Sequence, residues 1–182
     1  MNLRNKNRLY IIYNFFRITL IKLFHSKQFK GCNIQKISPA TKFNLMDKNS
    51  EINLGKRLHM LDGTLINADG GKISIGDYTF INRNCNIVSK KRIEIGRETS
   101  IGPGVQIYDH DHALGDRRGN FECDEIKIGN GCWIGANAVI LRGTIIGDNS
   151  VVGAGTVVKG EVGENKIIYS KSNIKEKDII NF

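Results

Sequence analysis

Aliphatic residues recur at every sixth position along most of the chain, with polar and small residues between them. They are, in order, Ile75, Ile81, Ile87, Ile93, then after a two-residue slip Ile95, Ile101, Ile107, and again Ile128, Ile134, Ile140, Ile146, Val152 and Val158. In most repeats a small or β-branched residue follows four positions after the aliphatic residue. Neither the 3.6-residue period of an amphipathic helix nor the two-residue period of a half-buried strand explains a period of six.

A period of six, taken three repeats to a turn, predicts a triangular coil in which each flat face is one short strand. The aliphatic residue of each repeat would point inward, and the small residue would lie near a corner. Stacked coils would pair their backbone groups and place each inward side chain against its counterpart in the next layer. Cys85 and Cys132 occupy small-residue positions, so we interpret them as core residues rather than as metal ligands.

The six-residue rhythm stops between Ile107 and Ile128, which are 21 residues apart, three more than three repeats. We therefore expect a loop over residues 109–125 to leave the coil there. This loop contains His110 and His112, each preceded by an aspartate, in a chain that has four histidines. Functional residues often lie on loops that a rigid scaffold positions, but the doublet alone fits metal ligands, a catalytic base or an ordinary polar loop.

The positive charge of the chain is concentrated at its N-terminus. Nine Lys and Arg residues precede Asp47 without any Asp or Glu and account for the formal charge of +9, while the remaining 18 basic residues balance 18 acidic ones. Within this basic arm, residues 1–30, the apolar stretch Leu9 to Phe24 is interrupted by three polar or charged residues, so it is a poor membrane-spanning helix. It suits either a helix on an anionic membrane surface or a helix packed on its own domain or on another subunit.

The rest of the composition limits the partners and the compartment. Nucleic acid is not an expected partner, because the chain has no recognisable binding motif and no net charge from Asp47 onward. The four cysteines form no Cys-x-x-Cys pair, and the N-terminus lacks the features of a secretory signal peptide. Both observations indicate free thiols in the cytoplasm, at the inner face of the membrane if the arm binds lipid.

Four segments carry a resemblance to a known family: FINRNCNIV (80–88), IGPGVQIY (101–108), IKIGNGCWIGANAVI (126–140) and IIGDNSVVGAGTVV (145–158). They resemble the hexapeptide-repeat acyltransferases, and among these the maltose and galactoside O-acetyltransferases and the surface-polysaccharide O-acetyltransferases. The resemblance implies an all-β fold, a left-handed parallel β-helix over residues 31–166. This domain would follow the apolar and basic arm, expected to be helical, and precede a short C-terminal cap at 167–182 with a helix around 173–178.

The resemblance also implies catalytic residues. In the family's Pro-Gly-Val-x-Ile-Tyr segment the catalytic histidine comes five residues after the isoleucine, which in this chain is His112, with His110 as the fallback. A neutral imidazole suits a base that takes the proton of a sugar hydroxyl near pH 7. Asn82 matches a residue that orients the acceptor or stabilises the transition state; the alternative is a corner asparagine that only bonds the backbone. The backbone amide of Ala136 is the implied donor to the oxyanion.

Acetyl-CoA is the implied co-substrate, and no metal is expected. The residues implied to bind it are Ala136, Ala154, Trp133, Lys159 and Lys175. Trp133 could line the channel for the pantetheine arm or instead cap the core. The family's Gly-Asn-Pro-Ala-Lys tail is replaced here by YSKSNIK (169–175), so contacts with the phosphates of coenzyme A are expected from lysines near this segment.

These observations predict an acetyl-CoA-dependent O-acetyltransferase that modifies a sugar or a surface glycan of the capsule or lipopolysaccharide type. The resemblance implies a homotrimer with its sites between subunits. Four alternatives stay open: an N-acetyltransferase acting on a nucleotide amino sugar, an antibiotic acetyltransferase, a zinc enzyme that would need three converging histidines, and a β-helix scaffold without catalysis.

Overall fold

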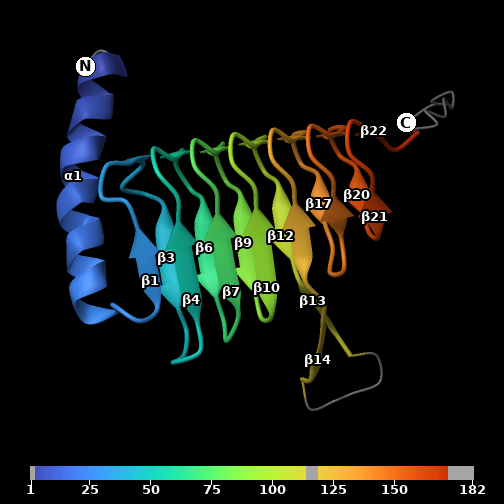
Figure 1. The fold of residues 1–182 in the computed structure, drawn as a ribbon, viewed down its shortest axis with the longest axis horizontal. Helices are drawn as coiled ribbons and strands as arrows, with labels where there is room; N and C mark the ends of the chain where they lie inside the picture. The colour runs from blue at the N-terminus through green and yellow to red at the C-terminus, as the bar shows by residue number, and fades with distance from the viewer. Residues whose placement is uncertain (1–2, 114–118, 172–182) are drawn as a thin grey trace, which may run out of the picture.

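The computed structural model describes residues 3–113 and 119–171, which form one helix followed by a solenoid of short strands (Figure 1). The chain turns through the same three faces on every coil, and each face becomes a parallel sheet running the length of the solenoid. This architecture is a parallel β-helix. It confirms the all-β fold class and the helical arm. The proposed helix at 173–178 lies outside the described residues.

The three parallel sheets, here called A, B and C, are built from strands that alternate in chain order. Sheet A contains β1 (Phe29–Gly31), β4 (Glu51–Leu54), β7 (Lys72–Ile75), β10 (Arg92–Ile95), β15 (Ile126–Ile128), β18 (Ile145–Ile146) and β21 (Glu161–Val162). Sheet B contains β2 (Lys36–Ile37), β5 (His59–Met60), β8 (Phe80–Ile81), β11 (Ser100–Ile101), β16 (Trp133–Ile134), β19 (Val151–Val152) and β22 (Ile167–Ile168). Sheet C contains β3 (Lys42–Leu45), β6 (Leu65–Ala68), β9 (Asn86–Ser89), β12 (Gln106–Tyr108), β17 (Val139–Ile140) and β20 (Val157–Val158).

Neighbouring coils stack in register, so the inward residues form columns through the core. Ile81 pairs with Ile101, and Ile101 pairs with Ile134, and all three are fully buried. Burying one such side chain contributes about 1.5–3 kcal/mol to the stability of the fold. Cys85 and Cys132 are also core residues, 0% and 1% exposed, as the repeat predicts.

The two-residue slip in the repeat reflects a change in coil length. Ile73 pairs with Ile93, 20 residues later, whereas Ile128 pairs with Ile146, only 18 residues later. In the longer coils a four-residue strand of sheet A turns two aliphatic residues inward; in β10 these are Ile93 and Ile95, 0% and 3% exposed. The extra residues therefore lengthen the strands of sheets A and C and leave the stacking intact.

Successive sheets meet at three corners, which we call the AB, BC and CA corners after the sheets that they join. At the AB corner, a Cβ on Gly96 would lie 2.5 Å from the carbonyl carbon and oxygen of Gly129 in the next coil, so only glycine permits the coils to approach this closely. At the BC corner, the backbone of Asn84 and Asn137 is left-handed, with φ of 57° and 55°. Asparagine is among the few residues that tolerate this conformation.

α1 (Leu3–Phe24) lies across the N-terminal end of the solenoid (Figure 1). Ile18, which is 0% exposed, completes the core at this end. Asn14 Nδ2 donates a hydrogen bond to Ile37 O at 2.7 Å, and Arg17 Nη2 donates one to Thr41 O at 2.5 Å. The arm therefore packs on its own domain. Among the described residues, no helix has a stretch that is both long and apolar enough to cross a bilayer.

Candidate active site

The two histidines of the interrupted repeat lie on a hairpin that leaves the solenoid at the CA corner (Figure 1). The chain leaves sheet C after β12, forms β13 (His110–His112), returns through β14 (Phe121–Cys123) and re-enters sheet A at β15. β13 and β14 pair antiparallel, with His110 opposite Cys123 and His112 opposite Phe121. A single hairpin thus carries both histidines outward from a rigid coil.

Asp109 anchors the root of this hairpin. Its side chain is fully buried and accepts hydrogen bonds from Ser89 Oγ at 2.6 Å, from Lys90 N at 2.8 Å and from Lys91 N at 2.9 Å. The Nδ1 atom of His110 lies 3.1 Å from the same carboxylate. A buried carboxylate surrounded by donors is well satisfied, and here it ties the point where the chain leaves the coil to the corner of the preceding coil.

The two imidazole rings have different surroundings. His110, whose side chain is 14% exposed, is held between Asp109 and the edge of the Phe121 ring, with ring centroids 5.3 Å apart. His112 is exposed, and its ring packs on Phe121 in a tilted arrangement, with ring centroids 4.7 Å apart. His110 is therefore oriented by a carboxylate, whereas His112 is the ring that solvent or a second molecule can reach.

Arg142 links the hairpin to the following coil. Its Nε donates to Asp111 Oδ2 at 2.7 Å, and its Nη2 pairs with Glu122 on the other strand. This role could not be predicted from the sequence, because Arg142 follows an ordinary repeat and its partners Asp111 and Glu122 lie on the two strands of the hairpin. Asp109 and Asp111 are thus paired with His110 and Arg142, and neither carboxylate is paired with His112 within the described residues.

The cysteine on the hairpin is not a good nucleophile. Burial raises the pKa of the Cys123 thiol above its ordinary value, and the nearby Asp109 carboxylate raises it further. The thiol therefore stays protonated near neutral pH, and the thiolate is the nucleophilic form. Among the described residues, no group of three or more His, Cys, Asp or Glu side chains is arranged to hold a metal ion.

The other residues singled out from the sequence lie at the opposite edge of sheet C, at the BC corner. Ile81, Ile101, Ile134 and Val152 stack in register on sheet B, so the residues just after them, Asn82, Ala136 and Ala154, follow one another along this corner. Asn82 Oδ1 accepts a hydrogen bond from Arg83 N at 2.8 Å, which is the backbone contact expected of a corner asparagine.

Trp133 and the lysines are placed less uniformly. Trp133 is 60% exposed on sheet B, so it does not cap the core; its place in a ligand channel stays a prediction. Lys159 follows β20 at the CA corner, on the histidine side of sheet C. Lys175 lies outside the described residues.

Within one chain, the histidines of the hairpin and the residues singled out at the BC corner lie far apart. His110 and His112 leave from the CA corner, and Asn82, Ala136 and Ala154 line the BC corner, so a strand of sheet C separates them. About five residues at roughly 3.3 Å each make this separation about 16 Å. A reaction that uses both groups therefore needs the CA corner of one chain and the BC corner of another.

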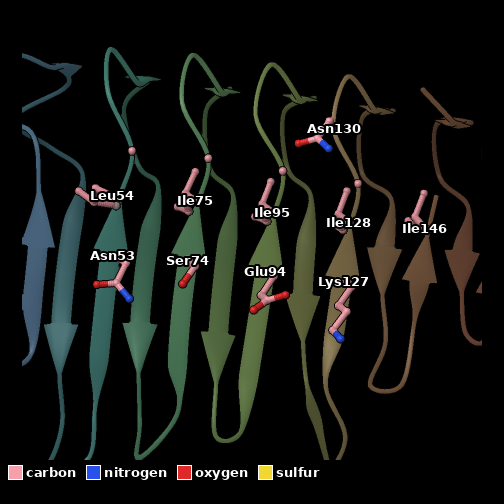
Figure 2. A pocket seen from close by; sticks show the side chains of 14 residues that line it. Asn53, Leu54, Ser74, Ile75, Glu94, Ile95, Lys127, Ile128, Asn130 and Ile146 are labelled. Carbon is pink, nitrogen blue, oxygen red and sulfur yellow. The ribbon is translucent and has the colours of Figure 1, made fainter. Parts of the chain in front are cut away.

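A shallow groove follows the third corner, AB, and Figure 2 shows it. Asn53, Ser74, Glu94 and Lys127 form a row of polar side chains on sheet A beside a row of aliphatic residues. The groove contains no histidine, and the hairpin leaves from the other edge of sheet A. It is therefore separate from the candidate active site.

The six-residue repeat and the parallel β-helix together define a class of protein. Comparisons with known proteins lead to the same class. Residues 125–160 match the family model described as bacterial transferase hexapeptide (six repeats). WbbJ of Escherichia coli K12, named as an O-acetyl transferase of lipopolysaccharide biosynthesis, is 35% identical over 131 residues, which cover 64% of this chain and 66% of WbbJ. The chain belongs to the hexapeptide-repeat transferases.

Two further proteins support this assignment. The galactoside O-acetyltransferase of E. coli K12 is 36% identical over 101 residues, 54% of this chain and 50% of that protein. A solved structure of a hexapeptide-repeat acetyltransferase from Vibrio cholerae in complex with acetyl-CoA is 26% identical with a TM-score of 0.54, over 88% of this chain and 82% of that one. The chain spans about half to two thirds of the length of the two E. coli relatives.

Proposed function

We propose that the protein transfers an acetyl group from acetyl-CoA to a hydroxyl of a sugar or surface glycan, with His112 as the general base. The observation that carries this proposal is the exposed imidazole of His112 on a hairpin that is fixed at its root by Asp109 and clamped by Arg142. The named O-acetyltransferases among the relatives, and the acetyl-CoA complex of the Vibrio protein, support the acceptor and donor classes.

In the proposed reaction, His112 takes the proton of the acceptor hydroxyl as its oxygen attacks the thioester carbonyl. The tetrahedral oxyanion accepts a hydrogen bond from the backbone amide of Ala136 of a neighbouring subunit. Among the described residues, no acceptor bonds this amide, whereas the flanking amides of Gly135 and Asn137 bond Val152 O and Pro103 O. The C–S bond then breaks, and the imidazolium of His112 returns its proton to the coenzyme A sulfur.

His110 is proposed as a positioning residue for this base. Its ring packs on Phe121, against which His112 also lies, and Asp109 fixes its orientation. A general base contributes about 10² to 10⁴ in rate. His112→Ala should therefore lower kcat by about that factor, and His110→Ala by about tenfold or less, as expected of a residue that only orients.

The assay is release of coenzyme A from acetyl-CoA in the presence of sugars, nucleotide sugars, amino sugars and oligosaccharides. Turnover with amino sugars alone would favour N-acetyl transfer, and no turnover with any acceptor would favour a scaffold. Equal losses in the two variants that added zinc restores would indicate metal ligation. The reverse ranking of the two variants would make His110 the base.

We further propose a homotrimer in the cytoplasm, with each site formed by the CA corner of one subunit and the BC corner of the next. The four free cysteines fit a reducing compartment. We propose that Asn82 orients the acceptor, so His112→Ala and Asn82→Ala subunits should each be nearly inactive alone. Unfolded and refolded together in equal amounts, they should regain about a quarter of wild-type activity, because a closed ring then contains that fraction of intact sites. A monomeric mass under active conditions, or no recovery on mixing, would refute shared sites.

A further inference from the structure

The helix α1 has polar residues on the side that faces the protein. Asn14 is buried and bonds Ile37 O, and Arg17 bonds Thr41 O. Lys22 Nζ, on the same side, donates to Asn33 Oδ1 at 2.7 Å. Asn14, Arg17 and Lys22, which interrupt the apolar stretch in the sequence, therefore bond to other parts of the same chain. They do not interrupt the side of α1 that faces away from the solenoid.

The outer side of α1 is apolar along most of its length. Its large apolar residues, each between 44% and 74% exposed, are Leu9, Ile12, Tyr13, Phe15, Phe16, Leu20, Leu23 and Phe24. Positions 9, 12, 13, 16, 20, 23 and 24 follow the three- and four-residue spacing of one helix face. We call these eight residues the outer face of α1. A contiguous exposed apolar surface of this kind marks an interaction site.

The charges of the N-terminal region favour an anionic partner for the outer face. The chain has nine Lys and Arg residues and no acidic residue before Asp47. Beside Ile11 of α1, a cavity of about 450 Å³ is lined by Lys36, Arg57 and His59, and no acidic residue lines it. α1 itself contains no Asp or Glu, so a second copy packed through the same face would bring an equally basic helix against this one, with no carboxylate on either helix to pair. An anionic surface would instead gain from these charges.

We propose that the outer face of α1 lies flat on an anionic membrane, with its apolar side chains in the boundary between head groups and acyl chains. The cations at this end, including those of the cavity lined by Lys36 and Arg57, meet the lipid phosphates. α1 lies across one end of the solenoid (Figure 1), so the solenoid axis stands upright on the membrane. A helix with an apolar face and basic surroundings binds membranes in this way.

Binding is tested by sedimentation of the full chain with vesicles of phosphatidylcholine, with and without about 30% phosphatidylglycerol. The protein should sediment with the anionic vesicles and be released by salt. The double variant Phe16→Ser, Leu23→Ser should bind at least about tenfold more weakly, with an unchanged melting temperature because both residues are 68% or more exposed. Ile167→Ser is the matched control, since Ile167 is 71% exposed at the far end of the solenoid, and it should bind like the wild type.

Orientation is tested by quenching of tryptophan fluorescence with brominated lipids. Trp133 lies four coils from the first strand of sheet B, about 19 Å along the axis at roughly 4.8 Å per coil, so it should not be quenched in bound wild-type protein. A tryptophan introduced as Phe16→Trp in a Trp133→Phe background should be strongly quenched.

Three results would overturn the proposal. The first is no binding to anionic vesicles. The second is quenching of Trp133 to the same extent as the tryptophan at position 16. The third is an assembly in solution that the Phe16→Ser, Leu23→Ser variant dissociates, which would make the outer face an interface between copies of the chain. None of these measurements depends on the acetyltransferase activity.

Discussion

Replacing Asp109 by asparagine should destabilise the protein far more than one surface charge would. The carboxylate is 0% exposed and accepts hydrogen bonds from Ser89 Oγ, Lys90 N and Lys91 N at 2.6 to 2.9 Å. Asparagine has the same shape as aspartate, but it offers one acceptor oxygen in place of two. Its NH₂ group must therefore face some of the donors that now bond to Asp109. Hydrogen bonds to a charged group contribute about 1.5–3 kcal/mol each, and a buried donor without a partner costs about 1–3 kcal/mol.

One oxygen of the amide can keep part of this network, so we expect a loss of about 2–4 kcal/mol in the free energy of unfolding. For a chain of this size, 1 kcal/mol shifts the melting temperature by about 2–4 °C, so Asp109→Asn should melt about 5–15 °C below the wild type. Asp109→Ala leaves all the donors without a partner and should melt lower still.

The assay combines thermal unfolding with hydrogen exchange of the amides of Lys90 and Lys91, which should exchange faster in Asp109→Asn. Asp111→Asn is the control, because Asp111 is 41% exposed and pairs with Arg142 near the surface, where an ion pair contributes about 0–1 kcal/mol. A melting temperature for Asp109→Asn within about 2 °C of the wild type, with unchanged exchange at both amides, would refute the anchoring role.

Three further predictions concern the solenoid itself. Gly96→Ala should lower the free energy of unfolding by about 2–3 kcal/mol, because its Cβ would meet the backbone of the next coil. Gly155 has φ +67° and open space around it, so Gly155→Ala should cost only about 1 kcal/mol. Equal losses of unfolding free energy in chemical denaturation would contradict this difference. Burial lowers the pKa of His59 from 6.5, so the unfolded chain binds the proton of this imidazole more tightly than the folded protein does. Stability should therefore fall as the pH drops through about 6.5 and level off below the folded pKa. His59→Gln should flatten the plot of melting temperature against pH. Cys85 and Cys132, whose thiol pKa values burial raises, should react with iodoacetamide only after unfolding, as mass spectrometry would show.

The sequence was sufficient to predict the coil, because one physical constraint repeats along it. Every inward position must be aliphatic and must match the coils on both sides, as Ile101 does between Ile81 and Ile134. The same regularity locates the hairpin, since a segment without the repeat after Ile107 cannot stay in the stack. Periodicity therefore predicted the scaffold and the point at which the chain leaves it.

The contacts within the site could not be predicted in the same way. The pairing of Asp109 with Ser89, and of Arg142 with Asp111, joins residues that are 20 and 31 positions apart, and the antiparallel register of the hairpin decides which carboxylate meets which partner. The repeat contains no information on that register. Whether His112 is the base stays a prediction, because the proposed site combines two corners that lie apart on one chain.

The N-terminal helix shows what a pattern leaves open when the partner of each face is unknown. In the sequence, Asn14 and Arg17 argue against a membrane-spanning helix but do not decide between a helix on a membrane surface and a helix packed on the domain. In the structure they satisfy Ile37 O and Thr41 O at the open end of the solenoid, where the first coil has no preceding coil to bond. Capping these edges is necessary, because unpaired strand edges are sites of aggregation.

The same helix has a consequence for the acceptor. With α1 on the membrane, the hairpin leaves the fourth coil, three coils above the first. Three steps of roughly 4.8 Å and a helix of about 10 Å place the root of the hairpin about 24 Å from the boundary between head groups and acyl chains. A hydroxyl on a lipid head group would lie too far below His112, whereas a sugar several units along a lipid-linked glycan would reach it. The height of the hairpin therefore favours an oligosaccharide or polymer acceptor over a monosaccharide attached directly to lipid.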